Sequence, residues 1–372
     1  MDVGEVSQLW GQQYDRKFAE ILAVQEEIAK QVSEKLRLRP TGEEQKRLAK
    51  RSTENTEAYQ LYLKGRYYWN RRTGDLLKKA NEYFEQAIDK DPGYGLAYAG
   101  LAESYAVFNF YEVLPPSESC PKTKAAAMKA LEIDETLAEA HAALGWIKES
   151  CDWDWPGSER ELKRALEINP DYGTARNWYS AYFEAMGRLD EAIAERRRAL
   201  ELEPLSLIMS ASLGRVLWHA RKNDQAMGEL RKTIDMDPSF VEAHLYLGWV
   251  YEQMGMFAEA IAELRQALSG SGGGPRFVSA LGHAYAISGQ RRMAEESLAR
   301  LNEQSKQRYV APIDMAAIYI GLEEKEPALK YLEMAYADHS CWMVWLRVDP
   351  RFDAIRGDPR YLDLIRRMHL SP

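Results

Sequence analysis

The chain has few of the residues that mark a disulfide-rich or zinc-binding protein. Three cysteines occur among 372 residues, they lie far apart, and none belongs to a C-x-x-C pair. Isolated cysteines are typical of free thiols in a reducing compartment, so we expect neither a disulfide framework nor a zinc site. The three are Cys120, Cys151 and Cys341.

An excess of positive charge and a long apolar run are also missing. The net charge is −8, whereas a general nucleic-acid binder needs a basic surface to displace the counterions of phosphates. No apolar run approaches the roughly 18 residues of a membrane span. The opening MDVGEVSQLW has neither the basic start nor the apolar centre of a signal peptide. We expect a cytoplasmic chain with no membrane span that itself binds no nucleic acid; the alternative is a soluble part of a membrane-tethered parent.

Motifs of catalysis are not found either. The six histidines form no H-E-x-x-H pair and no G-x-S-x-G elbow occurs. The glycine-rich stretch 269–276, SGSGGGPR, lacks the Gly-Lys-Ser/Thr ending of a phosphate-binding loop and follows no predicted strand, which favours a linker. The sequence therefore predicts no catalytic residue, no cofactor and no metal ligand.

The stretch CDWDWPG, residues 151–157, places two aspartates between tryptophans. Residues two apart do not face each other on a helix, so the two carboxylates are poorly placed to act as a catalytic pair. We expect Asp152 or Asp154 to cap the following helix while the tryptophans cover a seam. An enzyme with a site near Asp152 and Asp154, or in a groove of the fold, stays as an alternative.

A period of 34 residues runs through the chain instead. Four alanines recur at this step, and three further sets of residues keep it: Ala192, Ala226, Ala260 and Ala294; Ser180, Gly214, Gly248 and Gly282; Phe183, Leu217, Tyr251 and Tyr285; Pro170, Pro204 and Pro238. Within one period, apolar residues recur at steps of three and four and are interrupted at Gly255. This pattern predicts two antiparallel helices in each period, with a turn at the glycine. Small residues such as Gly248 and Ala260 would let the two helices approach closely.

A helix pair of this size cannot bury its apolar face alone, so the pairs are expected to stack into an all-α solenoid. One period resembles the tetratricopeptide repeat family through the following residues: His244, Leu247, Gly248, Tyr251, Gly255, Ala260, Leu264 and Ala267. The resemblance implies a right-handed superhelical solenoid of about eight helix pairs over residues 56–338.

The two ends predict additional helices. Residues 1–55 are expected to hold an amphipathic helix between Phe18 and Leu36, as the junction or remnant of a missing upstream domain. Residues 339–372 are expected to form a C-terminal cap with an amphipathic helix. Both ends resemble bacterial regulators in which a TolB-like, winged-helix, kinase or cyclase domain accompanies a tetratricopeptide array. The resemblance implies the interaction or regulatory part of a signalling or transcription-regulator architecture.

In the tetratricopeptide family the first helix of each pair lines a concave groove. The resemblance places these side chains there: Tyr59, Tyr62, Arg66, Trp69, Glu149, Asn177, Glu184, Arg215, Trp218, Trp249 and Glu252. Exposed tryptophan, tyrosine and arginine are the usual anchors of protein interfaces, and three glutamates favour a basic or mixed peptide. We expect a non-enzymatic scaffold that binds a protein, a peptide or a sister domain in this groove. A helical-repeat RNA binder is a further alternative, which the acidic composition opposes.

Overall fold

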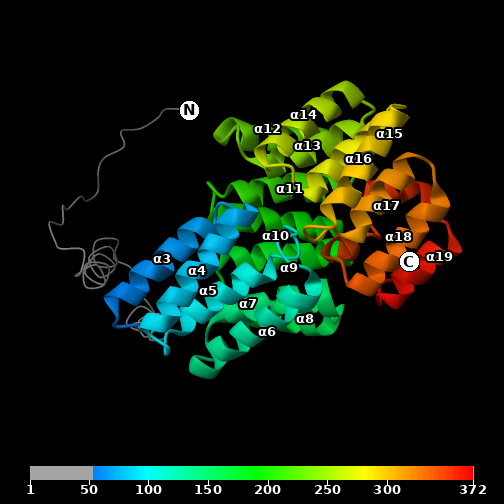
Figure 1. Ribbon diagram of the computed structural model, residues 1–372. Coiled ribbons are helices and arrows are strands. Elements are labelled where there is room, and N and C mark those ends of the chain that lie inside the picture. The colour runs from blue at the N-terminus through cyan, green and yellow to red at the C-terminus, as the bar shows by residue number, and fades with distance from the viewer. Residues whose placement is uncertain (1–52, 372) are drawn as a thin grey trace, which may run out of the picture.

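The computed structural model describes residues 53–371, which form eight consecutive helix pairs and contain no strand (Figure 1). The pairs are α3 (Thr56–Trp69) with α4 (Gly74–Lys90), α5 (Gly95–Ala106) with α6 (Pro116–Ile133), α7 (Ala138–Ile147) with α8 (Trp155–Ile168), α9 (Gly173–Ala185) with α10 (Leu189–Leu202), α11 (Leu207–His219) with α12 (Asn223–Met236), α13 (Val241–Gln253) with α14 (Phe257–Gly270), α15 (Pro275–Ile287) with α16 (Arg291–Gln304), and α17 (Pro312–Gly321) with α18 (Lys325–Asp338). The predicted all-α solenoid is confirmed. The amphipathic helix predicted between Phe18 and Leu36 lies outside the described residues.

One residue between the two helices of each pair adopts a left-handed backbone conformation. These residues are Arg72, Glu112, Trp153, Gly187, Arg221, Gly255, Gly289 and Glu323. At Gly255 the amide donates to the Glu252 carbonyl at 3.0 Å, and the next amide, of Met256, donates to the Tyr251 carbonyl at 2.9 Å. Such bonds satisfy the last carbonyls of a helix and turn the chain back. Each repeat therefore has a left-handed residue in the turn between its two helices, even where that residue is not glycine.

Glycines on the first helices allow the two helices of a pair to approach closely. A Cβ added at Gly248 would lie 2.5 Å from Leu264 Cγ of α14, and one at Gly214 would lie 2.4 Å from Leu230 Cγ of α12. Neither leucine can retreat easily, because both are fully buried. The close approach predicted at Gly248 is therefore present.

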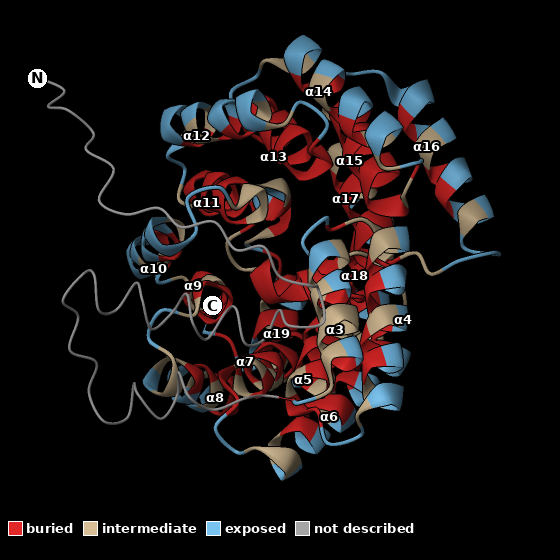
Figure 2. Cartoon of the chain, turned by 90° about the vertical axis from the view of Figure 1, so that its left-hand side faces the viewer, coloured by how far each residue is buried: buried red, intermediate tan, exposed pale blue. Residues whose placement is uncertain are grey.

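The first helices line the inside of the curved array and the second helices cover its outside (Figure 2). Helix α13 is buried from Val241 to Glu252, whereas α14 buries only four residues: Ala260, Ile261, Leu264 and Ala267. The first helices are thus covered both on the side that faces the second helices and on the side that faces the interior of the array. The second helices cover only the first of these sides, so another part of the chain must cover the interior side.

Two segments cover the inner side. The first is the C-terminal segment, with the short helices η3 (Cys341–Trp345) and η4 (Pro350–Ile355) and the helix α19 (Pro359–Arg367). The second is the loop 107–114, which lies between α5 and α6. The two segments meet where the Phe110 and Trp342 rings stack with centroids 4.9 Å apart.

Helix α19 buries the apolar face that the sequence predicted. Its residues Tyr361, Leu364 and Ile365, and Met368 just beyond it, are at most 1% exposed. The stretch from Cys341 to Phe352 lies within residues 339–372, which were expected to form a C-terminal cap, and it also contacts residues far from the last pair. Its residues reach inner helices from several pairs, because a run of apolar and aromatic side chains here fills the curved interior.

Contacts between distant parts of the chain hold these segments in place. The Trp155 indole N–H donates to the Met368 carbonyl at 2.7 Å, and Arg221 forms an ion pair with Asp353 at 2.7 Å. Such contacts are unusual in a simple stack, where each repeat touches its neighbours. The C-terminal segment thus links repeats that are far apart in the sequence.

The expectation of isolated free thiols is wrong for two cysteines. Cys120 of α6 and Cys151 form a disulfide, with Cα atoms 6.4 Å apart, a usual separation for such a bond. The sequence pattern concealed the pair because the two cysteines belong to different repeats that become neighbours only by stacking. Cys341 is free and buried. Since disulfides are rare in reducing compartments, the expectation of a cytoplasmic location loses one of its supports.

We predict that Gly248→Ala lowers the free energy of unfolding by about 1–3 kcal/mol, because the new methyl group collides with Leu264. The matched control is Gly228→Ala on the exposed side of α12, where no atom lies within 4 Å of an added Cβ. This control should gain up to about 1 kcal/mol from helix propensity. Urea unfolding followed by circular dichroism checks both, and equal effects would contradict the close packing.

We also predict that Trp345→Ala costs about 3–5 kcal/mol of stability, as large aromatic truncations in a core do. Trp345 is 1% exposed, although it lies in the chain's terminal segment. Leu205→Ala is the control, because Leu205 is 82% exposed and should change stability by less than about 0.5 kcal/mol. A cost for Trp345→Ala as small as that of the control would show that the C-terminal segment is not part of the core.

Candidate functional site

The eleven predicted groove residues all lie on the first helices or directly after one, but their exposure differs from the expectation. Seven are at most 7% exposed: Trp69, Glu149, Glu184, Arg215, Trp218, Trp249 and Glu252. Four are half-buried: Tyr59, Tyr62, Arg66 and Asn177. The expectation of exposed anchor side chains is therefore wrong for the seven, because other parts of the chain cover this face. A role in binding a partner stays a prediction.

In the first pair, the predicted residues contact other parts of the array. Arg66 forms an ion pair with Glu103 of α5, and its guanidinium lies 4.4 Å from the centre of the Trp69 ring. Tyr62 packs against Phe84, with ring centroids 5.8 Å apart. These side chains join neighbouring helices.

A buried charge cluster surrounds Glu184 on α9. Its carboxylate lies 2.9 Å from Arg215 and 2.6 Å from His219, both on α11. Burial opposes ionisation of Glu184, but Arg215 and His219 more than offset it, so the pKa lies below its usual value. Arg196 lies 3.8 Å away and donates to the Asn177 carbonyl at 2.9 Å. Two of the predicted groove residues, Glu184 and Arg215, thus form an internal ion pair.

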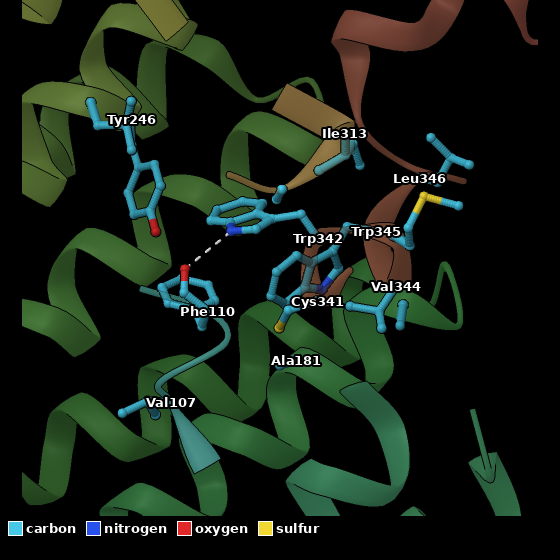
Figure 3. Packing of buried hydrophobic residues seen from close by; sticks show 14 of the residues in the cluster. Val107, Phe110, Ala181, Tyr246, Ile313, Cys341, Trp342, Val344, Trp345 and Leu346 are labelled. Atoms are coloured by element: carbon cyan, nitrogen blue, oxygen red, sulfur yellow. Dashed lines mark hydrogen bonds between the residues drawn. The ribbon is translucent and has the colours of Figure 1, made fainter. Parts of the chain in front are cut away.

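The C-terminal segment contacts this cluster through Trp345, and its aromatic side chains pack beside Phe110 of the loop 107–114 (Figure 3). The Arg215 guanidinium is 3.9 Å from the centre of the Trp345 ring, and the Trp342 indole N–H donates to the Phe110 carbonyl at 3.4 Å. Arginine against an aromatic face is a favourable cation–π arrangement. The aromatic residues of this segment therefore cover the charges of the inner helices.

Glu149 follows α7 in the π-helical segment η2 (Lys148–Asp152) and is fully buried. Neither of its carboxyl oxygens has a hydrogen-bond partner. Burial and the nearby charge of Glu184 raise the pKa of Glu149 well above its usual value. This carboxyl is therefore suited to a neutral state and is covered by the chain itself.

A second buried carboxyl pair joins the loop 107–114 to the far end of the array. Glu112 accepts a hydrogen bond from the Arg276 amide at 3.1 Å and is linked to the carboxyl of Asp314 on α17. Burial, followed by the charge of Asp314, raises the pKa of Glu112 well above its usual value. Burial also raises the pKa of Asp314. Because two nearby buried carboxylates repel each other, this arrangement favours a protonated carboxyl.

A pocket of about 650 Å³ remains where the C-terminal segment leaves the inner helices uncovered. Two predicted groove residues, Trp218 and Trp249, lie in its wall with their rings stacked at 5.2 Å. Glu252 of α13, one helical turn beyond Trp249, also lines it. The pocket thus brings together three of the eleven predicted residues.

Several other pocket residues were not predicted. They are Arg221, Gln253, His283, Arg291, Glu323, Arg351 and Asp353. Arg221 and Gln253 follow the predicted residues of α11 and α13, and His283 of α15 lies 34 residues after Trp249, so extending the same register to the next repeat could have found it. Arg291 begins α16 and Glu323 follows α17. Arg351 and Asp353 come from η4, and no repeat pattern places η4 beside the inner helices.

The aspartates of CDWDWPG have structural roles. Asp154 caps α8 by accepting from the Gly157 amide at 3.0 Å, and Asp152 forms an ion pair with Lys124 at 2.6 Å. Partial burial opposes ionisation of Asp154, but the Gly157 amide and the Lys148 ammonium lower its pKa overall. The capping prediction is confirmed, and so is the covering of a seam, since the Trp153 ring stacks on His339 at 4.3 Å.

Comparison with protein families identifies the repeat. Residues 211–275, which span α11 to the start of α15, match the tetratricopeptide repeat. The helix pairs α11–α12 and α13–α14 are therefore similar to tetratricopeptide repeats. In the tetratricopeptide array, the pocket therefore lies on the concave side formed by the first helices of the pairs.

Two kinds of curated protein are similar to part of this chain. The transcriptional regulator HilA of Salmonella paratyphi A is 25% identical over 144 residues, which are 39% of this chain and 26% of that protein. Putative adenylate cyclase 3 of Rhizobium meliloti is 27% identical over 146 residues, which are 38% of this chain and 25% of that protein. The chain thus spans about a quarter of the length of these relatives.

Solved structures show the same kind of array at low identity. A pilF structure of Pseudomonas aeruginosa is 19% identical and covers 60% of this chain and 95% of its own, with a TM-score of 0.41. The Cut9–Hcn1 hetero-tetramer of the APC/C is 17% identical and covers 61% of this chain and 46% of its own, with a TM-score of 0.46.

The part of the chain that the structure describes contains neither a candidate metal site nor a candidate membrane span. In residues 53–371, no group of three or more histidine, cysteine or acidic residues is placed to hold a metal ion. None of the helices within the same range is both long enough and apolar enough to cross a bilayer.

We predict that Glu112→Gln makes the tetratricopeptide array less sensitive to rising pH. Since the pKa of Glu112 is higher in the folded than in the unfolded chain, the folded state keeps its proton longer. Its stabilising effect is complete below the unfolded value of about 4.5 and is lost as pH rises towards the folded pKa. Glutamine can donate to Asp314 at any pH, so the variant should be more stable than the parent at pH 8 by at least about 1 kcal/mol.

Urea unfolding at pH 5 and pH 8 checks this prediction. The control is Glu118→Gln on the exposed side of α6, which should leave the pH dependence unchanged. An equal loss of stability between the two pH values for parent and Glu112→Gln would show that the carboxyl pair does not hold the proton.

Proposed function

We propose that the chain is a non-enzymatic scaffold that binds a protein or peptide in the concave pocket between Trp218, Trp249 and Glu252. The tetratricopeptide fold suits an interaction scaffold. The observation that supports this site is the pocket itself, because elsewhere the C-terminal segment and the loop 107–114 cover the inner helices. At about 650 Å³ it falls within the range of roughly 300–1,000 Å³ usual for ligand sites.

The stacked tryptophans suit such a role. The rings of Trp218 and Trp249 stack on each other, which fixes their orientation, and both residues line the pocket. Rigid aromatic anchors in a preformed hollow lose little conformational entropy on binding. The other predicted groove residues then act indirectly, because they hold the inner helices and the C-terminal segment in register.

We further propose that the array is the interaction part of a bacterial signalling or transcription-regulator architecture. The support is the likeness to HilA, described as a transcriptional regulator, and to a putative adenylate cyclase. The likeness covers about a quarter of those proteins, so most of their length lies outside it. A sister domain from the rest of such an architecture is the alternative partner of the pocket.

An enzymatic role near Asp152 and Asp154 has less support. Both aspartates already have partners, in an ion pair and a helix cap. A general acid needs a raised pKa, whereas the pKa of Asp154 is lowered. The contacts of these two residues account for their presence without catalysis.

Selection from a random peptide display library tests the pocket. Peptides selected on the full chain should bind Ala354→Trp at least tenfold more weakly, because Ala354 is exposed at the pocket rim and tryptophan there fills the opening. Ala125→Trp on exposed α6 is the control and should bind like the parent. Failure to select any peptide, or equal binding by Ala354→Trp, would refute the site.

A further inference from the structure

The arginines of the pocket already have carboxylate partners. Arg221 lies 2.7 and 2.8 Å from the two oxygens of Asp353, and Arg351 lies 2.5 Å from Asp349. Arg291 also forms ion pairs, with Glu295 and Glu324 on α16 and directly before α18. An anionic ligand would have to break these pairs, so the pocket is poorly suited to one.

Two acidic side chains of the pocket are less well matched. Glu252 is 7% exposed, and its Oε2 lies 3.0 Å from His283 Nδ1. Its Oε1 is buried and has no hydrogen-bond partner. Glu323 is exposed at the rim and has no ion-pair partner within residues 53–371. A buried acceptor without a donor is costly, and a ligand that donates a hydrogen bond would remove that cost.

The aromatic wall of the pocket favours the same kind of ligand. The stacked rings of Trp218 and Trp249 lie beside Glu252 in the pocket wall, and the chain already holds the Arg351 guanidinium 4.1 Å from the centre of the Trp249 ring. The indole N–H groups of both tryptophans have no acceptor. Each ring is 1% exposed, so a cation in the pocket would meet only the small part of the pair that borders the open volume.

We propose, building on the proposed function, that the pocket recognises a lysine or arginine side chain of the partner polypeptide through Glu252, with Glu323 at the rim and the two tryptophans beside it. The cation offsets the negative charge of Glu252, whose Oε1 has no donor of its own, and lies beside the part of the tryptophan pair that borders the pocket. Arg351 is the chain's own example of a cation in these surroundings.

The test uses three blocked pentapeptides with alanines around a central lysine, norleucine or glutamate. The full chain is labelled with 5-fluorotryptophan, and the fluorine signals of Trp218 and Trp249 are assigned by single phenylalanine substitutions. Titration at millimolar concentrations should shift both signals with the lysine peptide. The norleucine peptide, which has almost the same length without the charge, should bind at least tenfold more weakly, and the glutamate peptide should not bind.

Two charge-removing variants examine the acidic side chains separately. Glu252→Gln keeps the size of the side chain and should weaken lysine-peptide binding at least tenfold while norleucine binding is unchanged. Glu323→Gln changes an exposed residue, so folding should be intact, and should weaken lysine binding about threefold because a rim charge is screened by solvent. Glu259→Gln on the exposed side of α14 is the control and should bind like the parent.

The outcomes separate this inference from the proposed function. Equal binding of the lysine and norleucine peptides, or no lysine binding at all, overturns the recognition of a cation. The proposed site itself still stands in that case if selected peptides lose binding to Ala354→Trp. Unchanged lysine binding by both Glu252→Gln and Glu323→Gln would also overturn the inference, even if the lysine peptide binds.

Discussion

The structure depends on covering the apolar inner face of a curved helical array. Stacking buries each first helix against its own second helix and its neighbours, but the side towards the interior remains. This chain covers that side with its C-terminal segment and the loop 107–114, which meet at Phe110 and Trp342. Since apolar area removed from water is the main favourable contribution to folding, these segments belong to the core although they lie outside the repeats.

The same covering explains the ionisable groups inside the array. Once Trp345 lies over the inner helices, charges there lose water and need partners. Glu184 has them in Arg215 and His219. Glu112 and Asp314 instead lie close to each other in the interior, and burial raises the pKa of both carboxyl groups. The closure of the array is thereby linked to protonation of the pair.

The pocket is the part of the concave face that this covering leaves open. Its lining contains both arginines and acidic side chains. Its arginines are neutralised by carboxylates from η4 and from α16 to α18, whereas Glu252 keeps one oxygen unmatched beside two tryptophans. A surface of this kind can distinguish partners by charge, because an unmatched carboxylate oxygen repels acidic groups and is stabilised by a group that donates a hydrogen bond to it.

The sequence by itself determined the repeat. The recurrence of small, large and turn-forming residues every 34 positions predicts helix pairs, the close approach at Gly248 and the cap of α8 at Asp154, since local periodicity and capping depend on neighbours in the chain. The resemblance to the tetratricopeptide family, carried over by this register, implied that Trp218, Trp249 and Glu252 lie on the concave side. Only the tertiary structure decided that seven of the eleven groove residues are buried, that Cys120 reaches Cys151, and that Arg351 lies over Trp249. These contacts join distant segments through packing in three dimensions, and a one-dimensional period carries no information about which segment fills the space that the curvature creates.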